Sequence, residues 1–142
     1  MSEPLDPTER ELEILKILWE RDEATVRQVY EQMRQTAPIV QNPIVQNTVQ
    51  AFLRTMEEKG LVAHRREGRT FVYRPVPRRE QTNRRLAGRL LDRVFDGAMD
   101  QLVDSLLSVH RPSDEELKRL EELLAQAKTA RRKRRKPKEP RS

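Results

Sequence analysis

The stretch NTVQAFLRTMEEKG, residues 47–60, decides the fold. Apolar residues recur in it at the i, i+3, i+4, i+7 spacing of a buried helix face, and they are Val49, Phe52, Leu53 and Met56. Asn47 is predicted as the N-cap of this helix, and Lys59-Gly60 is a typical helix end. The opposite face is short and polar, and acid is displaced to Glu57 and Glu58. The first two turns therefore present hydrogen-bonding groups without negative charge.

Two further helices are predicted before this stretch. DPTERELEILKILWE indicates a helix near residues 7–20, with either Asp6 or Thr8 as its N-cap. EATVRQVYEQM indicates a second helix from about residue 26, because Thr25 and Gln28 form a capping pattern before an apolar stripe. The third helix therefore follows two others in close succession.

The residues after Gly60 change to a strand-like pattern. LVAHRREGRTFVYRPV is typical of two short strands around Glu67-Gly68, with Pro75 ending the second strand. Three residues of this hairpin are expected to point inward, and they are Val62, Phe71 and Tyr73. Three helices followed by a basic hairpin are the order of a winged helix-turn-helix domain, in which the third helix enters the major groove and the wing meets the backbone.

Residues 77–128 carry leucine-rich stripes on three predicted helices, which are interrupted at Gly97 and at HRPSD. A short string of helices cannot bury these stripes alone, and each leucine left in water forfeits about 1.5–3 kcal/mol. Packing on the N-terminal core is one solution, and an intertwined dimer is the favoured one because twofold symmetry adds a second half-site. The predicted dimer contacts are Leu90, Val94, Leu102, Val103, Leu106, Leu107, Leu117, Leu120 and Leu124.

Basic charge is concentrated at the C-terminal end. Of the chain's 29 basic and 23 acidic residues, eight basic and one acidic lie in residues 131–142, so the body is close to neutral. Such a tail is either a solvated, disordered terminus or a binding element for polyanions. The predicted fold is mainly α with a small β-hairpin wing. Its parts are a winged-helix domain in residues 1–76, a helical dimerisation region in residues 77–128 and a basic, disordered tail in residues 129–142.

Composition argues against several other classes of protein. The chain has no cysteine, which excludes disulfides and thiolate metal sites, and His64 and His110 are read as a wing and a loop histidine rather than metal ligands. No cofactor is expected. No catalytic set or glycine-rich phosphate loop stands out, so an enzyme is not expected. The absence of a long apolar run predicts a cytoplasmic protein that does not insert into membranes.

The sequence resembles the penicillinase repressor (BlaI/MecI-type) family of winged-helix transcription factors over nearly residues 5–127. The most specific pieces are ILW, ATVRQV, TVQAFLRTMEEKGLV and GRTFVYRP. The resemblance implies a homodimeric repressor on a double-stranded dyad operator, relieved by proteolysis through a membrane sensor-protease. Aligning MDQLVDSLL with the family places the cut between Ser105 and Leu106, where the family's usual Asn-Phe pair is missing.

The five-residue word PIVQN occurs twice in succession, at residues 38–42 and 43–47. Removing one copy aligns the chain with the family pattern, so residues 38–42 are interpreted as a tandem insertion in the loop before the third helix. Loop extension costs little free energy. The second copy is the one that leads into the helix.

A DNA-binding site follows from this reading. The third helix would read bases and the wing would contact phosphate or the minor groove, through Asn47, Thr48, Gln50, Ala51, Arg54, Arg65, Arg66, Arg69 and Thr70. The alternative is a helical adaptor whose winged domain binds protein and whose basic tail serves as an anchor. An adaptor would expose apolar anchors on the third helix, where this chain has polar residues.

Overall fold

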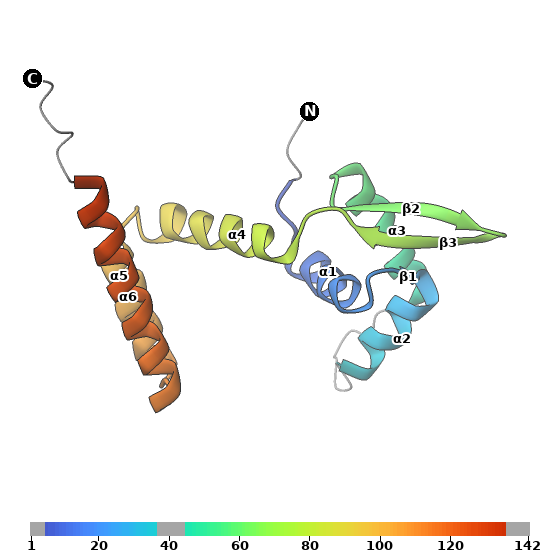
Figure 1. Ribbon diagram of the computed structural model, residues 1–142. Coiled ribbons are helices and arrows are strands. Elements are labelled where there is room, and N and C mark those ends of the chain that lie inside the picture. Colours follow the sequence, from blue (N-terminus) through green and yellow to red (C-terminus); the bar gives the residue numbers. More distant parts are fainter. Residues whose placement is uncertain (1–4, 37–44, 136–142) are drawn as a thin grey trace, which may run out of the picture. The chain divides into compact units, whose positions relative to one another are not determined.

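The computed structural model describes residues 5–36 and 45–135, which form two compact units. The first unit ends at Leu90 and the second begins at Leu91. In chain order, the elements are α1 (Glu9–Arg21), β1 (Ala24–Thr25), α2 (Val26–Thr36), α3 (Gln46–Glu58), β2 (Val62–Glu67), β3 (Thr70–Pro75), α4 (Arg79–Val94), α5 (Met99–Val109) and α6 (Asp114–Arg135) (Figure 1). The first repeat, at residues 38–42, and the start of the second lie outside the described residues.

The first unit is a winged helix-turn-helix domain, which confirms the predicted fold class. α1, α2 and α3 bury one shared core together with the base of the hairpin. The fully buried side chains include Val49, Leu53 and Met56 of the predicted α3 stripe, whereas Phe52 is only partly buried. The largest fully buried side chains are Ile14, Leu15, Leu18, Leu53, Met56 and Leu61. The core excludes water because apolar residues recur at helical spacing on all three helices.

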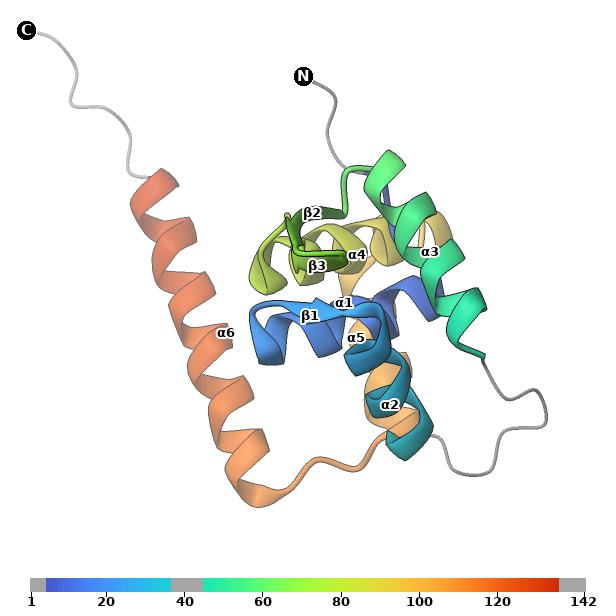
Figure 2. The same ribbon diagram turned by 90° about the vertical axis from the view of Figure 1, so that its right-hand side faces the viewer.

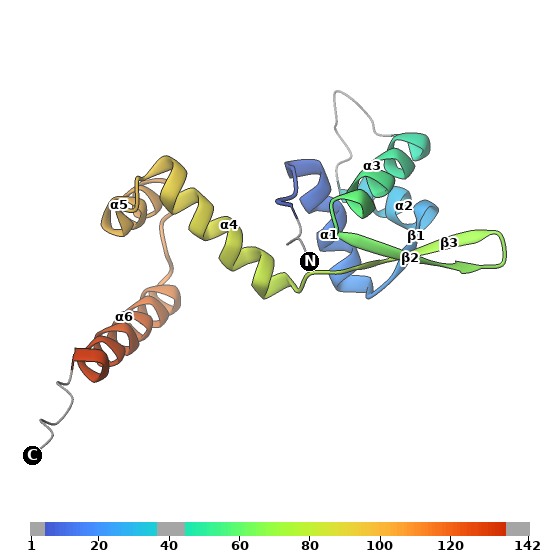
Figure 3. The same cartoon turned by 90° about the horizontal axis from the view of Figure 1, so that it is seen from above.

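The sheet has three antiparallel strands in the order β1-β3-β2. β3 is central, so Val72 pairs with Thr25 on one side and with Arg65 on the other. Figure 3 shows the β2–β3 hairpin projecting from the helices as a wing. Val62 and Tyr73 are buried as predicted, whereas Phe71 is only partly buried. Val72, which pairs with Thr25 of β1, is buried as well.

The start of α3 corrects the predicted cap. Val45, not Asn47, is the N-cap residue, and Asn47 lies inside the first turn. The carbonyl oxygen of Val45 accepts hydrogen bonds from the backbone N–H groups of Thr48 and Val49 at 3.0 and 3.1 Å. The N-cap makes no side-chain hydrogen bond to this helix within the described residues. Asn47 therefore does not act as the N-cap, and its side chain is exposed.

The start of α1 resolves the open choice between Asp6 and Thr8. Thr8 is the N-cap, and it forms a reciprocal capping box with Glu11. Asp6 instead contacts α4 through Arg89, whose Nε lies 2.7 Å from a carboxylate oxygen of Asp6. The indole N–H of Trp19 donates a hydrogen bond to the carbonyl oxygen of Pro77, 3.0 Å away. These contacts connect residues 77–89 to the helices of the first unit, which runs through Leu90.

The second unit consists of the end of α4 with α5 and α6. Figure 2 shows α5 and α6 as two separate helices joined by an extended segment, and neither has a buried residue. α6 continues to Arg135. Residues 129–135 are therefore helical, whereas the sequence analysis predicted a disordered tail from residue 129. Arg and Lys are good helix formers, and four of them in the last turn complement the helix dipole. Among the described residues, no helix has the length and apolar content needed to span a membrane.

Candidate nucleic-acid interface

The outward face of α3 is polar, short and exposed. The five residues predicted to read DNA on this helix are all exposed, and they are Asn47, Thr48, Gln50, Ala51 and Arg54. Val49 and Leu53 lie between them in sequence and are fully buried. The burial of one stripe thus holds the polar stripe outward, and the buried side of α3 determines which residues a partner can reach.

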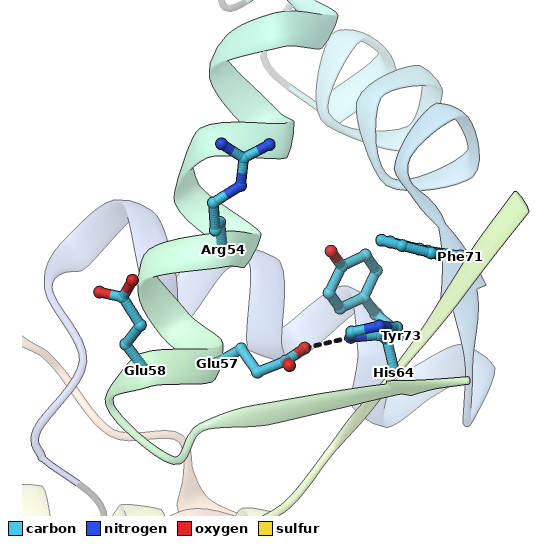
Figure 4. A pocket seen from close by; sticks show the side chains of 6 residues that line it. All are labelled: Arg54, Glu57, Glu58, His64, Phe71 and Tyr73. Carbon is cyan, nitrogen blue, oxygen red and sulfur yellow. Dashed lines mark hydrogen bonds and ion pairs between the residues drawn. The ribbon is translucent and has the colours of Figure 1, made fainter. Parts of the chain in front are cut away.

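Negative charge on α3 is confined to Glu57 and Glu58 in its last turn, and only Glu57 faces the wing. Glu57 points to His64 on β2, and its Oε1 lies 2.5 Å from the His64 Nδ1 (Figure 4). Glu58 projects on the other side of the helix in the same view. The predicted acid-free surface is therefore real for the first turns of α3.

A hollow of about 420 Å³ lies between the end of α3 and the wing, and the six residues around it are Arg54, Glu57, Glu58, His64, Phe71 and Tyr73. The His64 ring stacks on Phe71 with 4.3 Å between the ring centres. Burial, with a smaller contribution from the charge of Glu57, raises the pKa of the Tyr73 hydroxyl. The pairing of Glu57 with His64 joins α3 to the wing. Sequence reasoning did not find it, because no spacing rule connects a helix end to a strand.

The wing arginines differ in their surroundings. Arg65 is held by two carboxylates, with its Nη2 2.8 Å from Glu23 and its Nη1 3.0 Å from Glu67. The hydrogen bond from Arg65 lowers the pKa of the Glu23 carboxyl. The Arg66 guanidinium lies 5.5 Å from the centre of the Phe71 ring. The charge of Arg65 is thus largely offset by its neighbours, which the sequence did not indicate because Glu23 is 42 residues away.

The tip of the wing carries the remaining predicted residues. Gly68 has a φ of 65°, in the left-handed region that the tight turn requires. Arg69 and Thr70 follow it and are exposed. Among the described residues, Arg69 has no ion pair. In the part of the chain that the structure describes, the charge of Arg69 is therefore not offset by an ion pair, unlike that of Arg65.

The predicted dimer contacts lie on α4, α5 and α6 and remain uncovered in the single chain. Leu102 is partly buried, and the other eight are exposed: Leu90, Val94, Val103, Leu106, Leu107, Leu117, Leu120 and Leu124. Leu106, for example, is 51% exposed. The Ser105-Leu106 bond lies within α5. Within the described residues, no group of three or more His, Asp or Glu could hold a metal ion.

Comparison with known proteins places these features in a family. The family model described as penicillinase repressor matches residues 7–126. The Penicillinase repressor of Bacillus licheniformis is 26% identical over 121 residues, which cover 85% of this chain and 91% of that protein.

Two solved structures are also similar to this chain. The solution structure of the DNA binding domain of the repressor BlaI is 26% identical, covers 57% of this chain and 93% of its own, and has a TM-score of 0.47. The hsRosR-S4 complex structure is 19% identical, covers 88% of this chain and 92% of its own, and has a TM-score of 0.48. Because the family model spans most of the sequence, the chain belongs to the penicillinase repressor family.

Proposed function

We propose that this chain is a transcriptional repressor that binds a dyad DNA operator as a homodimer. The observation that carries the proposal is the outward face of α3, which is exposed, hydrogen-bonding and free of acid over its first two turns. Family membership supports it, since the curated relative is a penicillinase repressor. An adaptor function is not favoured, because the exposed positions from Gln46 to Arg54 are polar or small.

In this proposal α3 lies in the major groove. Asn47, Gln50 and Arg54 carry the side chains that can read base edges, since Asn and Gln pair with adenine and Arg pairs with guanine. Thr48 and Ala51 are short enough to approach a thymine methyl group. The wing contacts the backbone mainly through Arg66, Arg69 and Thr70, with Arg65 held back by its two carboxylates. Repression follows because the bound protein occupies the promoter.

The dimer uses the leucine-rich faces of α4, α5 and α6. Large apolar side chains that are exposed on successive helices mark a surface that another chain covers. A second copy is the favoured partner because a dyad operator requires twofold symmetry. Each winged domain then occupies one half-site.

Replacing Gln50 or Arg54 by Ala should weaken operator binding by about 1–3 kcal/mol and change binding to random DNA little, because the lost contacts are to base edges. The operator is first obtained by selection from a random duplex library, and affinities are then measured by gel shift. Lys16→Ala is the control, because it removes a basic side chain from the exposed face of α1. Equal losses on operator and random DNA would exclude base reading by these residues.

Induction is proposed to occur by cleavage within α5, as the resemblance implies, at or near Ser105-Leu106. A protease cannot cut a bond held in a helix without local unfolding, so α5 must open first. Induced cells should contain a fragment that ends between residues 102 and 107, detected by mass spectrometry of the repressor before and after induction. An intact chain that leaves the promoter would rule out cleavage as the switch.

A further inference from the structure

The last turns of α6 carry a strong and unbalanced positive charge. Residues 126–135 contain six basic side chains and no acid. The match to the penicillinase repressor family ends at residue 126, so all six basic residues lie beyond the matched region. The start of α6 is different in character, since three acids stand in its first turn. Opposite charges at the two ends of α6 both stabilise the helix dipole, but dipole stabilisation does not require the basic residues to share a face.

Four of the six basic residues do share a face. Lys128, Arg131, Arg132 and Arg135 follow the i, i+3, i+4, i+7 spacing and line one depression on the helix surface. We call them the α6 basic face. Lys133 and Arg134 lie at roughly 140° and 240° from Lys128 on a helix of 100° per residue, outside this face.

The α6 basic face has no internal counter-charge. Its four side chains are exposed, and among the described residues none forms an ion pair. The acids that precede them along the helix end at Glu122, which is engaged by Arg119 at 3.2 Å. Like charges three and four residues apart destabilise a helix, so a bound polyanion would relieve a repulsion that the described part of the chain leaves uncompensated.

The same segment is unsuited to an apolar partner. The leucines of α6 end at Leu124, and from residue 125 to 135 the largest apolar side chain is alanine. A membrane-surface helix needs bulky apolar residues opposite its basic face, and these are absent here. The leucine-rich contact proposed for the dimer also cannot continue into a face of Arg and Lys without burying charge.

We propose that the α6 basic face binds the phosphate backbone of duplex DNA, outside the bases read by α3. This inference rests on the proposed function, because a winged domain bound to its operator holds DNA at high local concentration for the rest of the chain. Arginine, which supplies three of the four side chains, suits phosphate because its guanidinium can donate two parallel hydrogen bonds. The face supplies affinity that does not depend on sequence.

The test compares two double variants of the full chain that each remove two positive charges from the same helix. Arg131→Gln/Arg132→Gln removes half of the α6 basic face, and Lys133→Gln/Arg134→Gln leaves that face intact. Binding to a random 40-base-pair duplex is measured over a range of salt concentrations. The first variant should reduce the magnitude of the slope of log K against log salt by about 1.8 for each protomer that contacts the duplex, since each phosphate contact contributes about 0.9. The second should change the slope by less than half as much.

Circular dichroism checks that α6 keeps its helix in both variants, and glutamine is a good helix former. Equal decreases in the two variants would overturn the assignment of a face, because they would indicate diffuse attraction. An unchanged slope in both would show that the segment does not contact DNA. In either case the preference for the selected operator over random DNA would persist if the proposed function holds. If the unmodified chain bound the selected operator no more tightly than random DNA, that result would instead contradict the proposed function.

Discussion

Lys59→Ala is expected to lower the free energy of unfolding of the winged domain by about 3 kcal/mol, because it leaves a buried carboxylate without its counter-ion. The Glu11 side chain is only 2% exposed, and both of its oxygens accept hydrogen bonds from the Lys59 ammonium, at 2.8 and 3.0 Å. Glu11 also accepts a hydrogen bond from the backbone N–H of Thr8. The pair therefore joins the start of α1 to the end of α3. Urea denaturation of the full chain measures the effect.

Two further variants make this test specific. Lys16→Ala removes an exposed lysine from α1 and should change stability by less than about 0.5 kcal/mol. Glu11→Gln/Lys59→Met removes both charges, keeps a glutamine at the capping position and should recover most of the loss. A loss below about 1 kcal/mol for Lys59→Ala would mean that water compensates Glu11, and the buried pair would not stabilise the domain.

Leu106→Glu is expected to weaken binding to a full dyad operator by at least about 100-fold while binding to a single half-site stays the same. A dimer engages two half-sites as a linked pair, which raises affinity by about 10²–10⁴ over one domain alone. Leu106 is 51% exposed in the single chain, so a charged side chain at this position should change the stability of the monomer little. The same charge buried in the proposed dimer would lack a partner and break the contact. Sedimentation and gel shifts on full and half operators measure both effects.

Gln101→Glu is the matched control for this dimer test. It places an added negative charge on the same helix, but Gln101 lies at about 140° from Leu106 on a helical wheel and outside the leucine stripe. This variant should remain a dimer with unchanged operator affinity. A Leu106→Glu protein that still sedimented as a dimer would show that the proposed interface lies elsewhere.

The order and type of the helices and of the β2–β3 hairpin could be predicted from sequence because they depend on local patterns, whereas the two-residue strand β1 was missed because it forms only by pairing with β3. The apolar stripe of α3 reports which side is buried wherever the helix packs, and Thr8 with Glu11 marks a helix start through contacts three residues apart. The outward face of α3 follows from the same periodicity. The candidate base-reading residues on α3 are therefore the part of the site that local sequence reveals.

Two expectations drawn from residue type alone differed from the structure. Asn47 is a good N-cap by residue type, yet α3 begins at Gln46 because the Val45 carbonyl takes the first helical hydrogen bonds. The basic segment after residue 129 has the composition of a disordered tail, yet it extends α6 to Arg135. Composition indicates only how well a segment is solvated. Extending a helix that has already formed is easier than starting one, because each added residue loses conformational entropy but gains one backbone hydrogen bond.

The sequence by itself determined a winged helix-turn-helix fold, the polar face of α3 and the leucine stripes, because each depends on residues within a few turns of one another. Only the tertiary structure decided which charges are available to a partner. Glu23 reaches Arg65 across 42 residues, and Lys59 reaches Glu11 across 48. Such pairs depend on how helices and strands meet in space, and side-chain charge alone carries no information about which opposite charge will lie beside it.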